Sequence, residues 1–290
     1  MQTTCITCQE TRTIPFSWQH LVTFKIFQPQ PLLDKEDWLC ATCLKDLPWL
    51  EDNLQCDRCD RSLAGLSSSF TYAHQDWQIC YDCERWLASE EQLRQEPDLC
   101  LNPVTEDSGE EAGRILMWNR SVWQYNEVVQ DLIAQYKFKG NQSLKYFFAS
   151  LLWEQWRNLI ESTDPSIQRL SQETDLVTCI PLAPDRLIER GYNQAEQIGE
   201  LFAARSHLPF VPDALIRQGD LDKQSQKDRQ ARLKELWDKF INNPVRNADI
   251  HNKRVCLIDD IYTTGATIYA AAYALRSAGA KSVISLTMAR

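Results

Sequence analysis

Short apolar runs alternate with amphipathic segments along the second half of the chain. Apolar residues recur every three or four positions in residues 128–136 and again in residues 144–160, and this spacing predicts two helices. Strand-like apolar runs and further helical patterns then alternate in five segments: 176–180, 194–204, 255–258, 266–277 and 282–287. Strands that alternate with helices indicate a parallel sheet with right-handed crossovers. We therefore predict an α/β fold, with a parallel sheet flanked by helices, for residues 114–290.

The first part of the chain follows a different pattern. Residues 1–88 hold polar and aromatic stretches that are too short and irregular for long helices. Residues 89–113 contain eight acidic residues and one basic residue, Arg94, together with Pro97 and Pro103. This composition predicts the end of a helix followed by a linker or an exposed hairpin. We expect a small N-terminal module, an acidic connection and a larger α/β domain.

Composition and charge narrow the class of protein. The chain has 290 residues, of which 43% are hydrophobic and 24% charged, which is typical of a globular protein and excludes disorder as the main state. The formal net charge of -9 argues against a protein that coats nucleic acid over its whole surface. Residues 1–113 carry 8 Lys or Arg and 20 Asp or Glu, a net −12, whereas residues 114–290 carry 23 and 20, a net +3. A basic face for phosphate groups is therefore expected in the second part.

Cysteines are concentrated at the N-terminal end of the chain. Nine of the eleven lie within the first hundred residues, and eight of these form four C-x-x-C pairs: Cys5/Cys8, Cys40/Cys43, Cys56/Cys59 and Cys80/Cys83. No basic and apolar leader precedes the first pair, and the longest apolar stretch, residues 270–275, is too short to span a membrane. We expect a reducing, cytoplasmic setting, in which such pairs bind metal rather than form disulfides.

The spacing of the pairs suits zinc. Two residues between cysteines let both thiolates point at one ion, and two such knuckles complete a tetrahedral site. The eight thiolates therefore predict two structural Zn²⁺ sites of a double zinc ribbon, with the pairs joined either in sequence order or interleaved. A redox role is disfavoured, because four copies lie outside any strand-helix-strand setting. His74 and Cys100 are not expected to be ligands, and Cys179 and Cys256 are expected to pack as small hydrophobic residues.

The most specific chemical pattern is V-C-L-I-D-D-I-Y-T-T-G-A-T, residues 255–267. An apolar strand delivers Asp259 and Asp260, and a turn rich in hydroxyl groups then opens a helix. Backbone N–H groups at a helix N-terminus bind phosphate, and Gly265 permits a close backbone approach. The carboxylates would repel a lone phosphate, so we expect them to hold sugar hydroxyls or a Mg²⁺ ion that is shared with a polyphosphate. Helix capping needs one carboxylate and not two, and the sequence contains no P-loop pattern.

This segment resembles the phosphoribosyl pyrophosphate (PRPP) motif of type I phosphoribosyltransferases. The resemblance implies that PRPP binds together with Mg²⁺ and contacts eight residues: Asp259, Asp260, Tyr262, Thr263, Thr264, Gly265, Ala266 and Thr267. A second segment, residues 179–196, reads as a strand and a short loop that lead to Arg186 and Arg190, where a pyrophosphate group is expected to bind. The alternative for both arginines is a solvated charge on a helix.

Residues 190–194, R-G-Y-N-Q, are similar to the R-G-F-N-Q signature of the ComF family. The Y-K-F-K-G stretch at residues 136–140 and the paired cysteines extend this resemblance over nearly the whole chain. It implies a zinc-ribbon domain joined to a phosphoribosyltransferase-like domain, a role in DNA uptake during natural transformation, and a ComFA-type helicase as partner. Single-stranded DNA would contact basic residues around the site: Arg120, Lys137, Lys139, Lys145, Arg186 and Arg190.

Residues 217–240 correspond to a mobile loop that closes over PRPP in the related enzymes. Four basic residues are candidates to meet the departing pyrophosphate: Lys223, Lys227, Arg229 and Arg232. A solvated, charged helix is the alternative. Family members often show Gln, Leu, Arg and Asn at fixed offsets here. Gln224 and Arg232 fit that series, whereas Lys227 and Glu235 depart from it, so the resemblance does not assure transfer chemistry.

Three functions therefore stay open from the sequence. The leading hypothesis is a DNA-uptake protein that binds PRPP with Mg²⁺ and handles single-stranded DNA with a helicase partner. The second is an active phosphoribosyltransferase of the nucleotide salvage type, for which the resemblance identifies no hood over the acceptor. Its catalytic residues would be Asp259, Asp260, Lys223 and Arg232. The third is an interaction module in which the zinc ribbons dock a partner without catalysis.

Overall fold

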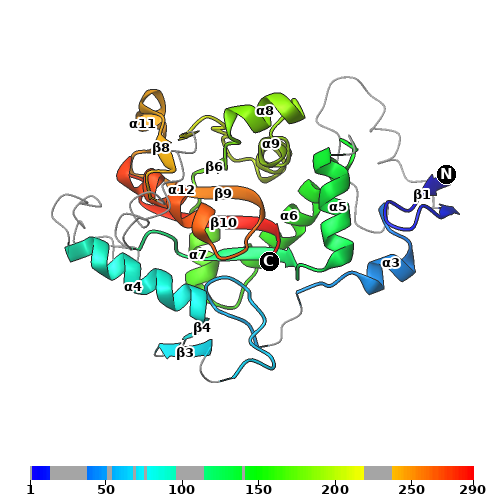
Figure 1. Cartoon of the computed structure of the whole chain (residues 1–290), viewed down its shortest axis with the longest axis horizontal. Coiled ribbons are helices and arrows are strands. Elements are labelled where there is room, and N and C mark those ends of the chain that lie inside the picture. Colours follow the sequence, from blue (N-terminus) through cyan, green and yellow to red (C-terminus); the bar gives the residue numbers. More distant parts are fainter. Residues whose placement is uncertain are drawn as a thin grey trace, which may run out of the picture.

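The centre of the molecule is a four-stranded parallel sheet (Figure 1). The computed structural model describes residues 2–13, 38–50, 54–67, 70–74, 77–95, 114–138, 141–218 and 237–290. The strand order is β5 (Asn119–Trp123), β10 (Ser282–Ala289), β9 (Arg254–Ile261) and β6 (Leu176–Cys179). Every neighbouring pair is parallel, which confirms the predicted α/β class.

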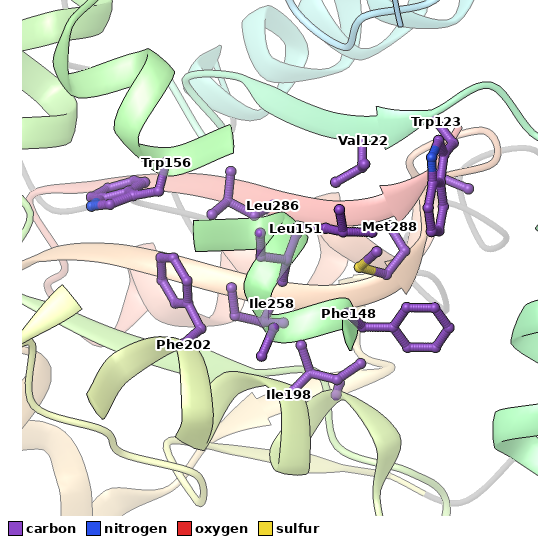
Figure 2. Close-up of a cluster of buried hydrophobic side chains, with 14 of the residues drawn as sticks. Val122, Trp123, Phe148, Leu151, Trp156, Ile198, Phe202, Ile258, Leu286 and Met288 are labelled. Carbon is purple, nitrogen blue, oxygen red and sulfur yellow. The ribbon is translucent and has the colours of Figure 1, made fainter. Parts of the chain in front are cut away.

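Helices cover one face of this sheet with a continuous apolar core. The covering elements are α5 (Glu127–Phe138), α6 (Leu144–Ile160), α7 (Pro165–Gln172) and α9 (Gln194–Ser206). Figure 2 shows Leu151 of α6 and Ile198 of α9 beside Ile258 of β9, with Leu286 of β10 in the same buried cluster. The three- and four-residue apolar spacing of α6 places its buried side chains on the face that meets the sheet.

The opposite face of the sheet has a separate core. Helix α12 (Ala266–Ser277) contributes Ile268 and Tyr269, and β9 contributes Leu257. The hairpin of β7 (Leu215–Arg217) and β8 (Phe240–Asn242) packs on α12. Three short elements complete this half of the chain: α8 (Pro184–Arg190), the 3-10 turn η4 (Pro244–Arg246) and α11 (Asn247–Ile250). The sheet is therefore covered on both faces, as parallel sheets require.

The N-terminal part consists of two small cysteine-containing units. The first holds β1 (Gln2–Thr4), β2 (Thr11–Thr13) and α3 (Ala41–Asp46). The second holds β3 (Thr71–His74), β4 (Trp77–Cys80) and α4 (Tyr81–Gln95). Each strand pair is antiparallel. Two four-cysteine units followed by the covered sheet confirm the predicted combination of a zinc-ribbon domain and a phosphoribosyltransferase-like domain.

Helix α4 corrects one prediction about the first part of the chain. The pattern in residues 1–88 predicts no long helix, yet α4 has 15 residues and continues across residue 88 into the acidic segment. Glu90, in the helix end predicted for this segment, is 1% exposed and forms an ion pair with the equally buried Arg58. The helix begins at a C-x-x-C pair, since Cys80 precedes its first residue and Cys83 lies in its first turn, and this anchor explains a helix that its weak apolar periodicity does not reveal.

Several boundaries predicted from the sequence are confirmed by the fold. Helices α6 and α12 begin and end at the predicted residues. The three predicted strands correspond to β6, β9 and β10, and the last two continue two to three residues further. The described part of the chain contains no helix that combines the length and the apolarity of a membrane span.

Candidate functional site

The loop between β9 and α12 has the geometry of an anion site. We call residues 262–265 the phosphate loop. Thr263 and Thr264 are exposed, and Gly265 occupies the N-cap position of α12 with φ 86°. A Cβ at Gly265 would collide with the ring of Tyr262 and lie 3.1 Å from Nε1 of Trp86, so both the conformation and the packing require glycine. No side chain within the described chain caps α12, and its first-turn N–H groups are therefore available to a ligand.

Two carboxylates stand at the carboxyl end of β9, next to this loop. The backbone N–H of Asp260 donates to Oδ1 of Asp259 at 2.9 Å, and Oδ2 of Asp260 pairs with Nζ of Lys137 from α5. Burial raises the pKa of Asp259 to about 8, and the adjacent negative charge of Asp260 contributes to this rise. Asp259 is hard to ionise in these surroundings, and Asp260 already pairs with a lysine. A cation between them would favour the charged form of both carboxylates, so the pair is suited to bind one.

The R-G-Y-N-Q segment links α8, α9 and α5. Arg190 donates from Nη1 to Oε1 of Gln194 at 3.0 Å, and its guanidinium lies over the ring of Phe138 at 4.8 Å. The hydroxyl of Tyr192 donates to the backbone carbonyl of Tyr136. Asn193 caps α9 through an Oδ1 that accepts the N–H of Ala195 at 3.2 Å. The two sequence signatures at residues 136–140 and 190–194 therefore contact each other, although more than fifty residues separate them.

The two predicted pyrophosphate-binding arginines differ in their surroundings. Arg190 is fixed by the contacts to Gln194 and Phe138, close to the α5 segment that also carries Lys137. Arg186 lies on the outer face of α8, where its side chain is 59% exposed and pairs with Glu189 at 2.9 Å. The structure thus gives Arg186 the form of the solvated helix charge that the sequence left as its alternative.

The remaining predicted ligand residues separate into three groups. Ala266 and Thr267 are the first two residues of α12. The side chain of Tyr262 is 1% exposed and packs under the guanidinium of Arg290 at 4.7 Å and against Gly265, so its phenol group is not accessible to a ligand in solvent. Lys223 and Arg232 lie outside the described residues, as do Lys227, Arg229 and Lys139.

Arg120 corrects the predicted basic surface. It was expected among the residues that meet DNA, but it is 8% exposed and pairs with Asp60 at 3.3 Å. The Arg120 guanidinium lies over the Trp118 ring at 5.1 Å. The residue is on β5, an edge strand whose outer edge is covered by the cysteine-rich part of the chain, and this cover shields Arg120 from solvent.

The cysteines form two groups in sequence order, which decides between the two predicted pairings. The first cluster is Cys5, Cys8, Cys40 and Cys43, and the second cluster is Cys56, Cys59, Cys80 and Cys83. Within each group the ligand atoms all lie within 4.8 Å of one another. Cys100 is outside the described residues, whereas Cys179 and Cys256 are fully buried in apolar surroundings, as predicted.

Both clusters fit a zinc ion. A regular tetrahedron with Zn–S bonds of about 2.3 Å has sulfur atoms about 3.8 Å apart. The Sγ atoms of Cys8 and Cys40 are 3.7 Å apart, and so are those of Cys59 and Cys80. Backbone N–H groups donate to Sγ of Cys5 and of Cys56, each at 3.3 Å, and such bonds stabilise thiolates. Burial raises the pKa of Cys59, so four thiolates can share this interior only around a cation.

A cavity of about 460 Å³ lies between the Cys56–Cys59 knuckle of the second cluster and the phosphate loop. Asp60, Arg61 and Ser62 line it from the knuckle, and Thr263 and Thr264 line it from the loop. The cavity shows that the cysteine-rich part and the sheet domain share a surface at the candidate site.

Sequence reasoning missed the residues that connect these two parts. Trp86 donates from Nε1 to the carbonyl of Thr264 at 2.7 Å, across 178 positions of sequence. Arg290 donates to the carbonyl of Thr263 at 3.1 Å. Lys137 was expected among DNA-binding residues, but not as the partner of Asp260. The only signal for it was its place in the Y-K-F-K-G stretch.

Fold and site together define a phosphoribosyltransferase-like α/β protein that carries two four-cysteine zinc-ribbon units. The chain is similar to competence protein ComFC of Streptococcus pneumoniae, with 29% identity over 245 residues, 82% of this chain and 99% of that protein. It is 27% identical to competence protein ComFC of Bacillus subtilis over 288 residues, 99% of this chain and 94% of that protein. DNA utilization protein YhgH of Escherichia coli is 26% identical over 214 residues, 71% of this chain and 88% of that protein. No family model and no solved structure matches. The chain is therefore similar, over most of its length, to competence and DNA utilization proteins.

Proposed function

We propose that this protein acts in DNA uptake and binds a phosphoribosyl ligand such as PRPP, with Mg²⁺, at the end of β9. The observation that carries the proposal is the direct succession of Asp259 and Asp260, an exposed pair of threonines and an uncapped helix N-terminus. This succession offers oxygen ligands for a cation and N–H donors for a phosphate within one short segment.

Each part of the segment has a chemical task in this proposal. Asp259 and Asp260 hold the ribose hydroxyls, or the Mg²⁺ that the diphosphate shares. The phosphate loop and the first residues of α12, Ala266 and Thr267, donate to the phosphate group. When bound, Mg²⁺ neutralises charge on the diphosphate. A cation held by the two carboxylates would compete with Lys137 for the Asp260 oxygen that Lys137 now contacts.

The pyrophosphate end of the ligand is assigned to the R-G-Y-N-Q side of the site. Arg190 is the stronger candidate there, since it is oriented by Gln194 and Phe138 before any ligand arrives. Arg186 would have to exchange Glu189 for the ligand. Lys223 and Arg232 complete this set in the proposal on the basis of the family resemblance.

Calorimetry with the zinc-loaded full chain tests the ligand. We expect PRPP to bind one to one, with tighter binding when Mg²⁺ is present. The double substitution Asp259→Asn with Asp260→Asn should weaken binding at least about tenfold, corresponding to about 1.4 kcal/mol. Asp249→Asn is the matched control, because Asp249 is a 48% exposed carboxylate on α11 that pairs with Arg246. Equal affinity of both variants would reject the assignment, and so would absence of PRPP binding by the wild type.

The DNA part of the proposal rests on the names of the relatives, which are competence and DNA utilization proteins. We propose that single-stranded DNA contacts the positively charged second part of the chain and that a helicase of the ComFA type is the partner. Filter binding at several salt concentrations measures this, because phosphate contacts make affinity fall as salt rises. Absence of binding to single-stranded DNA even at low salt would contradict it.

An active transferase is the second candidate function, and the shifted pKa of Asp259 is the observation that favours it. A carboxyl group with a pKa of about 8 beside a cation-binding partner is typical of catalytic sites. In such a reaction a nucleophile attacks the ribose C1 carbon as pyrophosphate leaves, and the protein's residues stabilise the leaving charge. Release of pyrophosphate that depends on an added nucleobase, and that the double Asn variant abolishes, is the expected result. No release with any base of a panel would reject the transferase.

A further inference from the structure

Two carbonyl groups of the phosphate loop accept hydrogen bonds from side chains near the second cluster. Trp86 lies on α4, three residues after the ligand Cys83, and its indole N–H donates to the carbonyl of Thr264 at 2.7 Å. Arg290 donates from Nη1 to the carbonyl of Thr263 at 3.1 Å, and its Nη2 lies 3.7 Å from Sγ of the ligand Cys80. Two consecutive carbonyls of the loop are thus tied to the surroundings of a single metal cluster.

These two bonds also set the direction of the loop's N–H groups. In a planar trans peptide, the C=O and the following N–H point in opposite directions. Since the carbonyls of Thr263 and Thr264 point towards Arg290 and Trp86, the N–H groups of Thr264 and Gly265 point away from these donors. The loop therefore presents donors, and not acceptors, on the side opposite the second cluster, and a phosphate requires donors.

Aromatic packing also joins α4 to the first turn of α12, next to the phosphate loop. The Trp86 ring stacks on Tyr269 of α12, with centroids 4.5 Å apart and an interplanar angle of 11°. Trp237 contacts Trp86 edge-on, with ring centroids 5.7 Å apart. Tyr262 lies under Arg290, which is itself 3% exposed. The first turn of α12 is thereby packed against the helix that carries Cys83.

The Cys56–Cys59 knuckle of the second cluster is also fixed to α4 and to the sheet. Arg58, between Cys56 and Cys59, is fully buried and pairs with Glu90 of α4 at 3.2 Å. Its guanidinium also donates to the carbonyl of Leu116, and its own carbonyl accepts the N–H of Asn119 of β5 at 2.7 Å. The cluster, α4 and the sheet are therefore joined by buried polar contacts as well as by apolar packing.

We propose that the second zinc cluster positions the phosphate loop through Trp86 and Arg290, so that its metal occupancy and ligand binding at the loop are coupled. The first cluster has no such role in this proposal. The consequences for PRPP rest on the proposed function, whereas the consequences for the loop itself do not. Trp86 and Arg290 are positioning residues, because they act on the loop and not on the ligand.

Trp86→Phe is the most selective test, since it removes the indole donor and keeps an aromatic ring against Tyr269. The matched control is Trp49→Phe, because Trp49 makes the same kind of bond beside the first cluster, to the carbonyl of Leu44 at 2.6 Å. The first readout is amide hydrogen exchange without ligand at Tyr262 and Tyr269. Their N–H groups bond to the carbonyls of Ala289 and Gly265 at each end of the loop. We expect about three- to tenfold faster exchange in Trp86→Phe and no change at these amides in Trp49→Phe.

The second readout is PRPP affinity by calorimetry, measured on variants that still contain two zinc ions per chain. Trp86→Phe should bind PRPP about three- to tenfold more weakly than the wild type and than Trp49→Phe. Arg290→Lys is a second variant, because lysine cannot reach Thr263 and Cys80 with two separate donors, and we expect the same direction of change. Unchanged exchange and unchanged affinity in zinc-replete Trp86→Phe and Arg290→Lys would overturn the proposal. Faster exchange in these variants, together with a wild type that does not bind PRPP, would support the positioning role and reject the proposed ligand.

Discussion

The two four-cysteine clusters have the same cysteine spacing but different surroundings. All four cysteines of the second cluster are at most 1% exposed and belong to the core that contains α12 and the sheet. In the first cluster Cys8 is exposed and Cys40 and Cys43 are half-buried. The first unit packs against the core on the other face of the sheet through aromatic contacts, such as that between Trp38 and Phe147, whose ring centroids are 6.0 Å apart. Ligand spacing thus indicates a metal, and the packing around it indicates what the metal supports.

Replacing one cysteine ligand in each cluster should give the largest difference in stability between the two parts of the molecule. Cys59→Ser should release one zinc ion and lower the free energy of unfolding by about 5 kcal/mol or more, because zinc binding and folding of the second core are linked. Cys8→Ser should release the other zinc ion and lower the stability of the sheet domain by only about 1 kcal/mol, because the first unit can open locally. Metal analysis and thermal unfolding measure both. Similar losses of stability in the two variants would contradict the comparison.

A buried ion pair distinguishes the two knuckles. Arg58 occupies the position before Cys59, whereas Thr7 occupies the equivalent position before Cys8. Arg58→Met leaves Glu90 buried without its partner and should lower the free energy of unfolding by about 3–5 kcal/mol. The double variant Arg58→Met with Glu90→Leu should recover part of that loss, and Thr7→Val should change little. Urea unfolding tests this, and a small effect of Arg58→Met would show that the second knuckle is not fixed by the pair.

The burial of Asp259 beside the phosphate loop should also make the stability of the protein depend on pH. Because the pKa of Asp259 is raised to about 8 in the folded chain, the folded chain keeps a proton that the unfolded chain releases above about pH 4. Wild-type stability should therefore fall as the pH rises through this window, on the order of 2 kcal/mol between pH 5 and pH 7.

The variant Asp259→Asn isolates this effect. Without Mg²⁺ and without ligand, it should be more stable than the wild type at pH 7 and nearly equal to it at pH 4. Unfolding in urea at both pH values is the measurement, with Asp249→Asn as the exposed control. A wild type whose stability relative to Asp259→Asn does not change with pH would contradict the raised pKa.

The smallest expected effect on stability is that of replacing Arg186. Its pair with Glu189 is more than half exposed, so Arg186→Ala should change the free energy of unfolding by no more than about 0.5 kcal/mol. Any loss of PRPP affinity in this variant would then report a contact with the ligand. Arg190→Ala should weaken PRPP binding more, since Arg190 is already oriented at the site. Equal PRPP affinities of the two variants would show that Arg190 contributes no more to ligand binding than Arg186 does.

Local patterns explain which parts of the fold could be predicted. Helix α12 and strand β9 were found because an apolar run, a glycine turn and an amphipathic repeat follow one another within a few residues. Strand β5 was missed because Asn119 and Ser121 are polar, yet both are buried. Ser121 bonds to Thr287 at 2.7 Å and Asn119 accepts from Ser285 at 2.9 Å, so partners on β10 satisfy them. Such pairing is invisible in either strand alone.

The same reason limits what could be predicted of the site. The carboxylates and the threonines are adjacent in sequence, and their spacing is sufficient to propose a phosphate site. The residues that orient the loop are distant in sequence, and Trp86 shows no local signal of its role. The sequence could likewise indicate two zinc sites, but the contacts that separate a peripheral cluster from one that supports the loop depend on tertiary packing.

If the second cluster and the phosphate loop act as one unit, zinc binding and ligand binding must affect each other reciprocally. The direct measurement is the rate of zinc release to a chromogenic chelator from Cys8→Ser, which keeps only the second cluster. PRPP with Mg²⁺ should slow this release about three- to tenfold, and adding Trp86→Phe should remove most of that difference. An unchanged release rate at a PRPP concentration that saturates the protein would contradict this coupling.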